Sequence, residues 1–273
     1  MAEKRKIKNI NISSDTLNPV EITNRERRII NDNTSFMITE AYKAARTNIM
    51  FSLNGVKGSK KIVFSSATSG EGKTTTCINI AKTFAQTGAK VIILDMDLRA
   101  PRIHKYIKIN NDKGVSNVLA GFDELKSCIV HTEQENFDCL TAGAIPPNPV
   151  ELISSDSMVE LLSELEEEYD YIFMDTPPLN IVTEAIILSK VATGIILVTR
   201  QKYTMYKFIE RALEALEFAG AKILGFILND AENDKYVYGG YGRKSRKNRY
   251  VRYGYYTASK GKSSKEYKSA DKE

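Results

Sequence analysis

The chain has 273 residues and a mass of 30.6 kDa, enough for one large domain or two small ones with a buried core. Its hydrophobic fraction of 42% and charged fraction of 27% exclude collagen-like, disordered and membrane classes. The net charge of +5 is divided unevenly along the chain. Residues 1–234 carry 27 basic and 31 acidic residues, whereas residues 235–273 carry 12 and 3, so an acidic body precedes a basic tail of net charge +9.

Neither a membrane span nor a secretory signal is expected. No stretch approaches the ~18 consecutive apolar residues of a span, and the first residues, MAEKRKIKNIN, lack the apolar core of a signal peptide. Cys77, Cys128 and Cys139 are odd in number and widely spaced, so neither a disulfide framework nor a structural zinc site is expected. These features favour a cytoplasmic protein.

Apolar runs and amphipathic segments alternate after a polar arm at residues 1–35. Helical spacing of apolar side chains predicts a first helix within residues 35–53. Short apolar runs predict strands at 61–67, 90–97, 137–143, 169–177, 194–200 and 222–230. Intervening segments predict a helix ending near Gly88 and others at 115–119, 158–169, 183–190 and 204–219. The alternation predicts a doubly wound α/β domain over residues 36–234, with a mostly parallel sheet.

The last part of the chain follows neither a helical nor a strand period. Residues 235–273 hold 8 of the 14 tyrosines, interleaved with glycine, lysine and arginine. This composition is typical of a low-complexity segment, and it predicts a flexible, disordered, basic tail.

A glycine-rich turn lies between the first predicted strand and the helix that follows it. It reads ATSGEGKT from Ala67 to Thr74, with alanine where the general phosphate-loop pattern begins with glycine. Backbone N–H groups of such a turn point at phosphates, and the lysine reaches the terminal phosphates. An ordinary Gly/Ser turn is the alternative, but the strand before and the helix after favour nucleoside triphosphate binding. The expected ATP-binding residues of this loop are Ser69, Gly70, Glu71, Gly72, Lys73, Thr74 and Thr75.

Carboxylates end two of the predicted strands. ILDMDLR closes the second strand with Asp95, Asp97 and Arg99, and IFMDTP closes a later strand with Asp175. Ligands gather at the carboxyl ends of parallel strands, so these side chains are expected near Lys73, although each alone could be a solvated strand end. Phosphoryl transfer needs a metal and a group that orients the nucleophile. Asp95 is therefore predicted to be the base, with Asp97, Asp175 and the Thr74 hydroxyl on Mg²⁺.

These motifs together resemble the bacterial tyrosine kinases (BY-kinases) of capsule and exopolysaccharide assembly, the CpsD/CapB type. The resemblance extends from TEAYKAARTNIMFS through GVSNVLAG and IPPNPVELISS to the tail, leaving about the first 35 residues unexplained. It implies a deviant P-loop fold related to MinD and ParA, with ATP and Mg²⁺ as cofactors. Lys73, Asp95, Asp97 and Asp175 are its implied catalytic residues, and Arg99 belongs to the second motif and the ATP site.

The resemblance also implies acceptors and an oligomer. In that family the tail tyrosines are phosphorylated by a neighbouring subunit of a ring. By position they are Tyr236, Tyr238, Tyr241, Tyr250, Tyr253, Tyr255 and Tyr256. The family's oligomerisation motif, Glu-x-x-Arg-x-x-Arg, is matched by Glu40, Lys43 and Arg46 on one helix face. Lys43 lacks the bidentate pairing of arginine, so a weaker ring is expected; without the resemblance, the triplet is a solvated charged face.

Further expectations come from the resemblance. Asn229 resembles the adenine-contacting asparagine of related ATPases, and a turn-initiating Asn-Asp pair is the alternative. The family acts at the inner face of the cell membrane, so a separate transmembrane adaptor is expected to recruit this chain, which would regulate polysaccharide polymerisation and export. A cognate phosphotyrosine phosphatase is a further expected partner.

Two other functions fit parts of this sequence. Positioning ATPases of plasmids and division sites carry a second lysine where this chain has Thr68, and they generally lack a tyrosine tail. The basic, aromatic tail could alternatively bind nucleic acid, through phosphate contacts and base stacking. The combination of motifs favours the kinase, and nucleic acid is not an expected partner.

Overall fold

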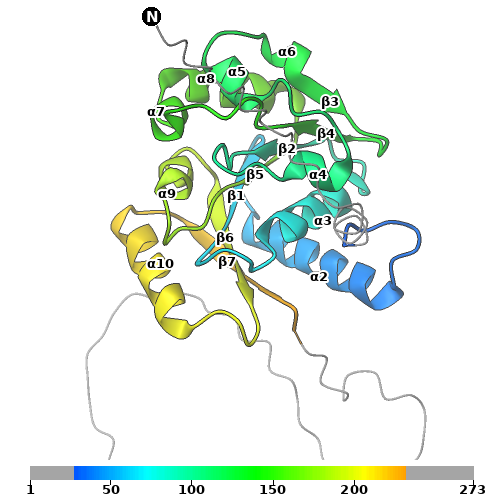
Figure 1. Cartoon of the computed structure of the whole chain (residues 1–273). Coiled ribbons are helices and arrows are strands. Elements are labelled where there is room, and N and C mark those ends of the chain that lie inside the picture. The colour runs from blue at the N-terminus through cyan, green and yellow to red at the C-terminus, as the bar shows by residue number, and fades with distance from the viewer. Residues whose placement is uncertain (1–27, 232–273) are drawn as a thin grey trace, which may run out of the picture. The chain divides into compact units, whose positions relative to one another are not determined.

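A computed structural model describes residues 28–231. Its centre is a seven-stranded sheet with the order β3-β4-β2-β5-β1-β6-β7 (Figure 1). The strands are β1 (Lys60–Ser66), β2 (Val91–Asp95), β3 (Ile129–His131), β4 (Phe137–Leu140), β5 (Tyr171–Asp175), β6 (Gly194–Arg200) and β7 (Ile223–Asn229). All neighbours pair in parallel except β3 and β4. The predicted doubly wound, mostly parallel fold is confirmed, and the short antiparallel strand β3 was not predicted.

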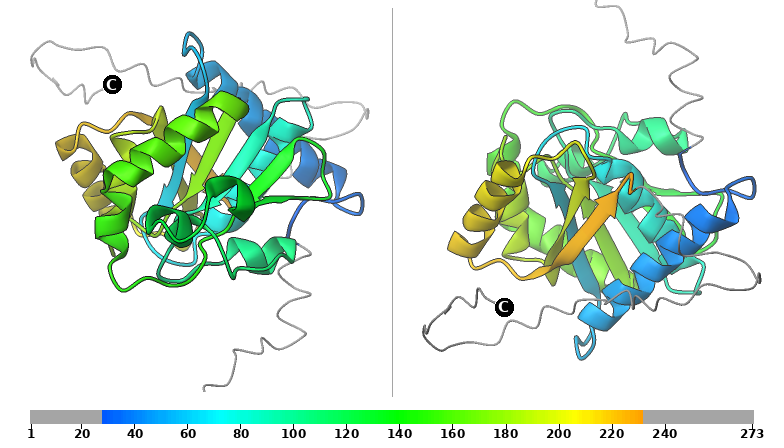
Figure 2. Two further views of the ribbon diagram at one scale, coloured as in Figure 1. Left: turned by 90° about the horizontal axis from the view of Figure 1, so that it is seen from above. Right: turned by 90° about the horizontal axis from the view of Figure 1, so that it is seen from below.

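Helices cover both faces of the sheet (Figure 2). They are α2 (Phe36–Ser52), α3 (Lys73–Ala85), α4 (Ile103–Ile107), α5 (Val115–Leu119), α6 (Leu125–Cys128), α7 (Pro149–Ile153), α8 (Asp156–Glu168), α9 (Glu184–Ser189) and α10 (Tyr206–Phe218). Sequence periodicity predicted the longer ones to within a few residues and missed α4, α6 and α7. No helix in the described part of the chain is long and apolar enough to span a membrane.

Strand side chains divide between two hydrophobic cores, one on each face. Along β1, Val63 packs into the core beneath α5, α8 and α10, whereas Ile62 and Phe64 pack into the core beneath α2 and α3. Alternate side chains of a strand point to opposite faces, so a strand buried on both faces must be apolar throughout. This explains why β1, β2, β5 and β6 were recognisable as apolar runs.

The helix that follows the glycine-rich loop is tightly packed on the sheet. Phe84 of α3 lies 5.3 Å from Phe173 of β5 and 4.5 Å from Tyr171, measured between ring centroids. Such tilted aromatic pairs contribute roughly 0.5 to 1.5 kcal/mol each beyond area burial. They hold α3, and with it the loop at its N-terminus, in a fixed position over the carboxyl ends of the strands.

The end of the predicted polar arm is packed against α3. Asn79, fully buried, accepts the N–H of Ile30 at 2.9 Å and donates to the carbonyl of Arg28 at 2.9 Å. Ile29 and Ile30 are themselves buried, and Lys82 donates to the Ile30 carbonyl. The chain therefore already belongs to the folded body at residue 28, before the expected boundary at residue 35.

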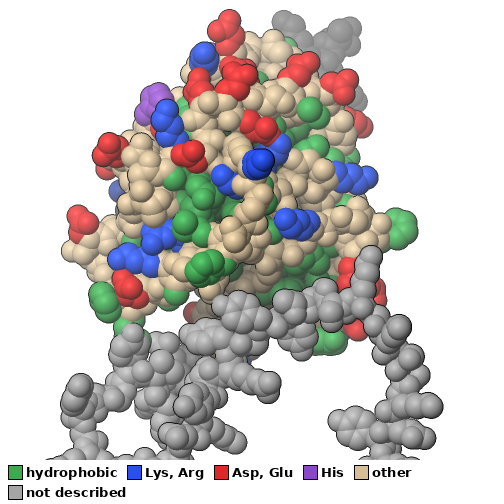
Figure 3. All heavy atoms as spheres, turned by 180° about the vertical axis from the view of Figure 1, so that it is seen from behind, with side chains coloured by type: hydrophobic (Ala, Val, Ile, Leu, Met, Phe, Trp, Pro, Cys, Tyr) green, Lys and Arg blue, Asp and Glu red, His purple; other side chains and the backbone are tan. Residues whose placement is uncertain are grey.

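Acidic side chains crowd the upper end of the molecule in Figure 3, the end that carries α6 and α8 in Figure 1. The exposed acidic residues of α8 are Asp156, Glu160, Glu164, Glu166, Glu167 and Glu168. These residues contribute to the net negative charge of residues 1–234. The predicted tail, residues 235–273, lies outside the described residues.

Candidate active site

The loop between β1 and α3 depends on two glycines. Gly70 and Gly72 both have a φ of +87°, a conformation that side chains with a Cβ rarely adopt. A Cβ on Gly72 would lie 2.0 Å from Asn229 Nδ2, and one on Gly70 would lie 2.9 Å from the hydroxyl of Tyr203. Ala67, which replaces the first glycine of the general pattern, has no positive φ, so alanine is accommodated there.

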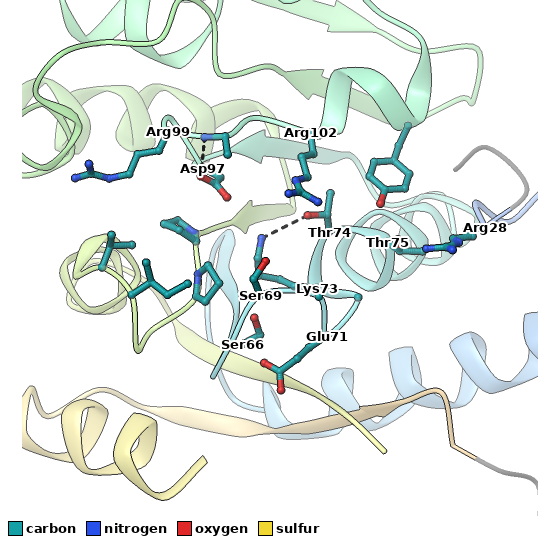
Figure 4. A pocket seen from close by; sticks show the side chains of 18 residues that line it. Arg28, Ser66, Ser69, Glu71, Lys73, Thr74, Thr75, Asp97, Arg99 and Arg102 are labelled. Atoms are coloured by element: carbon teal, nitrogen blue, oxygen red, sulfur yellow. Dashed lines mark hydrogen bonds between the residues drawn. The ribbon is translucent and has the colours of Figure 1, made fainter. Parts of the chain in front are cut away.

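Hydrogen bonds within the loop and to neighbouring elements hold the loop in place. Glu71 is buried, accepts the N–H of Thr68 at 2.7 Å and contacts the hydroxyl of Thr204. Asn229 Nδ2 donates to the Glu71 carbonyl at 2.9 Å. In Figure 4 the Glu71 side chain points away from Lys73. Glu71 and Asn229 therefore shape the loop, a role that the sequence did not reveal, and the adenine contact of Asn229 stays a prediction.

Lys73 lies at the centre of the site. Its ammonium nitrogen is 2.6 Å from Asp175 Oδ1 and 3.4 Å from Thr74 Oγ1. Both members of the ion pair are buried, with exposed fractions of 8% for Lys73 and 1% for Asp175. The expected convergence of the lysine, the threonine and this carboxylate is present in the structure.

Asp95 lies behind the pocket rather than in it. Its Oδ2 accepts the N–H groups of Arg102 and Ile103, each at 2.9 Å, and its Oδ1 accepts that of Asp97 at 3.3 Å. Burial, followed by the nearby Asp175 carboxylate, raises the pKa of Asp95 to about 7. Asp95 is fully buried, and its oxygens already accept three backbone N–H groups. This placement argues against the predicted role of Asp95 as the base and indicates that it shapes the following turn.

Asp97 is the carboxylate that faces the pocket. It lines the cavity beside Lys73 and Thr74, and its Oδ1 accepts the N–H of Ala100 at 3.1 Å. Burial raises the pKa of Asp97, while Lys73 opposes that shift. The predicted strand was expected to extend to residue 97, but β2 ends at Asp95 and Asp97 lies in the turn beyond.

The cavity itself has a volume of about 310 Å³ (Figure 4). Besides the loop residues it is lined by Arg28, Asp97, Arg99, Ala100, Arg102, Tyr106, Pro177, Pro178, Ile181 and Val182. Ser69, Gly70, Glu71, Gly72, Lys73, Thr74 and Thr75 of the expected ATP site all line it. Four cationic side chains around one cavity suit a polyphosphate, and the hydroxyl and carboxylate oxygens of Thr74, Asp97 and Asp175 are the donor type that Mg²⁺ prefers.

Arg28, Arg102 and Tyr106 are among the cavity residues that the sequence did not predict. Arg102 and Tyr106 follow the second motif, and their positions depend on the turn that Asp95 organises. Arg28 reaches the cavity because Asn79 holds the backbone beside it, across a separation of 51 residues. No local pattern could have indicated Arg28.

Arg99 is held at the cavity wall by an ion pair. Its Nε lies 2.7 Å from Oε1 of Glu184, the first residue of α9. Glu184 is only 1% exposed, and its Oε2 has no hydrogen-bond partner among the described residues. Arg99 is therefore held at its Nε by Glu184, while its side chain stays half-exposed and lines the cavity.

The three residues of the predicted oligomerisation motif make two different kinds of contact. Glu40 and Lys43 form a partly exposed ion pair at 2.9 Å on α2. Arg46 instead turns towards α3, where its Nη1 donates to the carbonyl of Thr83 at 2.7 Å. Arg46 thus joins two helices of one chain, and the triplet's role between subunits stays a prediction. All seven predicted acceptor tyrosines lie outside the described residues.

Comparisons with known proteins give matches over most of the described chain. Residues 59–218 match the family model described as AAA domain. The chain is 40% identical over 207 residues to tyrosine-protein kinase YwqD of Bacillus subtilis, covering 76% of this chain and 87% of that protein. It is 36% identical over 215 residues to the putative tyrosine-protein kinase CapB of Staphylococcus aureus, covering 77% and 94%.

Solved structures give the same grouping. The kinase domain of Escherichia coli tyrosine kinase ETK is 34% identical, with a TM-score of 0.69, over 75% of this chain and 80% of that one. The septum site-determining protein MinD from Pyrococcus horikoshii, complexed with Mg-ADP, is 27% identical, with a TM-score of 0.53, over 62% of this chain and 70% of that one. The chain is thus more similar to the tyrosine kinases than to the positioning ATPase.

Proposed function

Because the chain belongs to the family of bacterial tyrosine-protein kinases, we propose that it transfers the γ-phosphoryl group of ATP to tyrosines of its own C-terminal tail, in trans within an oligomer. The acceptors are Tyr236, Tyr238, Tyr241, Tyr250, Tyr253, Tyr255 and Tyr256. The observation that carries the proposal is one cavity that combines a phosphate loop, four cationic side chains with Lys73 among them, and the Asp97 carboxylate.

Nucleotide binding exchanges the partner of Lys73. In this structure the Lys73 ammonium group pairs with Asp175 at 2.6 Å. A triphosphate in the loop would offer the ammonium group oxygens of higher charge. Backbone N–H groups of Gly70 to Thr75, at the N-terminus of α3, receive the phosphates. The exchange frees the Asp175 carboxylate for the metal side of the site. Thr74 and Asp175 would hold Mg²⁺, which would neutralise charge on the phosphates.

Asp97 is the group best placed to receive the acceptor's proton. In the transfer, the bond from the γ-phosphorus to the ADP oxygen breaks, a bond from the tyrosine oxygen forms, and the phenolic proton passes to the carboxylate. A phenol has a pKa of about 10, so a carboxylate accepts its proton more readily when the pKa of the carboxyl group is raised towards that value. Burial raises the pKa of Asp97 in this sense. The proposal thereby moves the role of base from Asp95 to Asp97.

Several features support transfer to the tail. Residues 235–273 carry a net charge of +9 and would be attracted to an acidic neighbouring body. Asn229, seven residues before Tyr236, bonds to the phosphate loop. Seven extended residues span roughly 25 Å, so the first tyrosines can also reach the loop of their own chain. The experiment must therefore separate transfer within a chain from transfer between chains.

The cellular setting is also proposed from the family. A transmembrane adaptor would recruit the chain to the inner face of the membrane, and the kinase would regulate capsular or exopolysaccharide polymerisation and export. A phosphotyrosine phosphatase would reset the tail. Each phosphate adds about −1.5 to −2 of charge, so five or six would cancel the charge of the tail and loosen the oligomer.

The proposal is tested by incubating the purified full chain with ATP and Mg²⁺, with and without the cytoplasmic part of an adaptor. Phosphotyrosine should form in the native chain and be absent from Lys73→Met. Lys73→Met leaves Asp175 without its partner, so thermal unfolding must verify that the variant is folded. Equal labelling of both proteins, or label on serine and threonine alone, would refute the proposal.

A further inference from the structure

One wall of the active-site cavity is apolar and has no part in phosphate binding. Pro177, Pro178, Ile181 and Val182 form this wall, immediately after the strand that ends at Asp175. Ile181 is 63% exposed although it borders a charged cavity. An exposed aliphatic side chain at this place contributes little to the fold, and it offers surface to an apolar group that enters the cavity.

The wall is rigidly attached to the base of the phosphate loop. Leu179 donates its N–H to the carbonyl of Ser66 at 2.9 Å, and the hydroxyl of Ser65 donates to the carbonyl of Pro177 at 2.8 Å. The N–H groups of Ile181 and Val182 both donate to the carbonyl of Pro178, closing a turn. The apolar side chains therefore hold a fixed position relative to the phosphates.

The wall also adjoins Arg99. Glu184, two residues after Val182, binds the Arg99 guanidinium at 2.7 Å. Figure 4 shows Asp97 and Arg99 on one side of Lys73, with Thr75 and Arg28 on the opposite side. An aromatic ring between the wall and Arg99 would have apolar contact on one face and a guanidinium nearby, and a cation beside an aromatic ring is a favourable arrangement.

In-line phosphoryl transfer decides which aromatic group belongs there. The attacking and leaving oxygens lie on opposite sides of the γ-phosphorus. Because the proposed function passes the acceptor's proton to Asp97, the acceptor oxygen approaches from the side of Asp97, where Figure 4 also shows Arg99. A phenol ring on the wall would direct its hydroxyl towards both Asp97 and the γ-phosphate.

We propose that Pro177, Pro178, Ile181 and Val182 form the docking wall for the acceptor tyrosine ring, supplied by the tail of a second copy of this chain. The inference rests on the proposed function. The chain has 42 residues beyond residue 231, roughly 140 Å when extended, which is ample to reach a neighbouring cavity. Glycines flank the tyrosines of YGGYGR and RYGYY, so a narrow cavity can admit the ring without large neighbouring side chains.

The test separates enzyme from acceptor. The enzyme is the full chain with its seven acceptor tyrosines changed to phenylalanine, and the acceptor is the full Lys73→Met chain. Initial rates are measured against acceptor concentration and against ATP concentration. In the enzyme, Ile181→Ala removes three carbons from the wall, and we expect kcat/KM for the acceptor to fall about tenfold, with KM for ATP changed less than about twofold.

Ile145→Ala is the matched control. Ile145 is 65% exposed, almost the same as Ile181, but it does not line the cavity, so its loss should leave both parameters unchanged. If the parent enzyme labels the acceptor and Ile181→Ala labels it equally well, the docking wall is refuted while the kinase proposal stands. A rise in KM for ATP alone would assign the wall to the nucleoside and overturn the inference. No label from the parent enzyme would refute transfer in trans, and the docking wall with it.

Discussion

Replacing Gly72 with alanine should disable the phosphate loop by a defined amount. The left-handed conformation at φ +87° costs an alanine about 1 to 2 kcal/mol. The new Cβ would also lie 2.0 Å from Asn229 Nδ2, so that amide must move and lose its 2.9 Å hydrogen bond to the Glu71 carbonyl. That bond contributes about 1 kcal/mol. The variant loop relieves both costs by leaving its binding conformation, so nucleotide binding must restore them. Their sum, about 2 to 3 kcal/mol, then corresponds to a loss of roughly 30- to 150-fold in nucleotide affinity.

A double-mutant cycle separates the two contributions. Nucleotide Kd is measured with a fluorescent ATP analogue and Mg²⁺ for Gly72→Ala, Asn229→Ala and the double variant. Asn229→Ala alone should weaken binding about fivefold. The double variant should bind no worse than Gly72→Ala, because the side chain that collides with the new Cβ is gone and its hydrogen bond is already lost in the single variant.

Gly88→Ala supplies the control for the backbone conformation. Gly88 has a φ of +88°, but a Cβ there would meet no atom within 4 Å. It should lower the free energy of unfolding by about 1 kcal/mol and leave the nucleotide Kd unchanged. If the effects of Gly72→Ala and Asn229→Ala on Kd add to within about 0.3 kcal/mol, Asn229 does not brace the loop, and the reasoning is wrong.

Three further outcomes follow from other contacts. Asp97→Asn should lower kcat at least about 100-fold while the fluorescent analogue still binds. In the native enzyme, kcat should fall as the pH drops through the raised pKa of Asp97, at a pH above the ordinary aspartate range. An identical pH profile in Asp97→Asn would contradict the role of Asp97 as the base. Arg46→Ala should lower the free energy of unfolding by about 1 to 2 kcal/mol, because its hydrogen bond to the Thr83 carbonyl is lost. The denaturant midpoint should fall even in dilute protein. An effect seen only at concentrations where the protein oligomerises would indicate that Arg46 acts only between subunits. Asn79→Ala should release the segment around Ile30 and increase trypsin cleavage there, and unchanged cleavage would show that Asn79 does not hold it.

Sequence patterns predicted the parts of this protein that depend on local order. β1, β2, β5 and β6 are buried on both faces, so they are nearly continuous apolar runs. The phosphate loop was recognisable because its glycines, lysine and threonine must occupy fixed positions between a strand and a helix. The convergence of Lys73 and Asp175 follows from the parallel sheet itself, since the carboxyl ends of adjacent strands lie at one edge.

Other parts depend on contacts between distant residues. Asp95 was predicted to be the base, but β2 ends at this residue, and backbone N–H groups of the following turn donate to its oxygens. Arg46 lies on the expected helix, yet whether it faces solvent or α3 is decided by packing. Arg28 enters the cavity only because Asn79 fixes its backbone. Helical spacing carries no information on any of these contacts.

The central claim is that this cavity phosphorylates tail tyrosines of another copy of the chain. The most direct measurement mixes native protein with an isotopically labelled Lys73→Met chain, adds ATP and Mg²⁺, and maps phosphate on each chain by mass spectrometry. We predict phosphotyrosine between residues 236 and 256 of the labelled, inactive chain, at a rate that rises with the concentration of the native one. Phosphate confined to the native chain would contradict transfer in trans, and phosphate on neither chain would contradict kinase activity of this site.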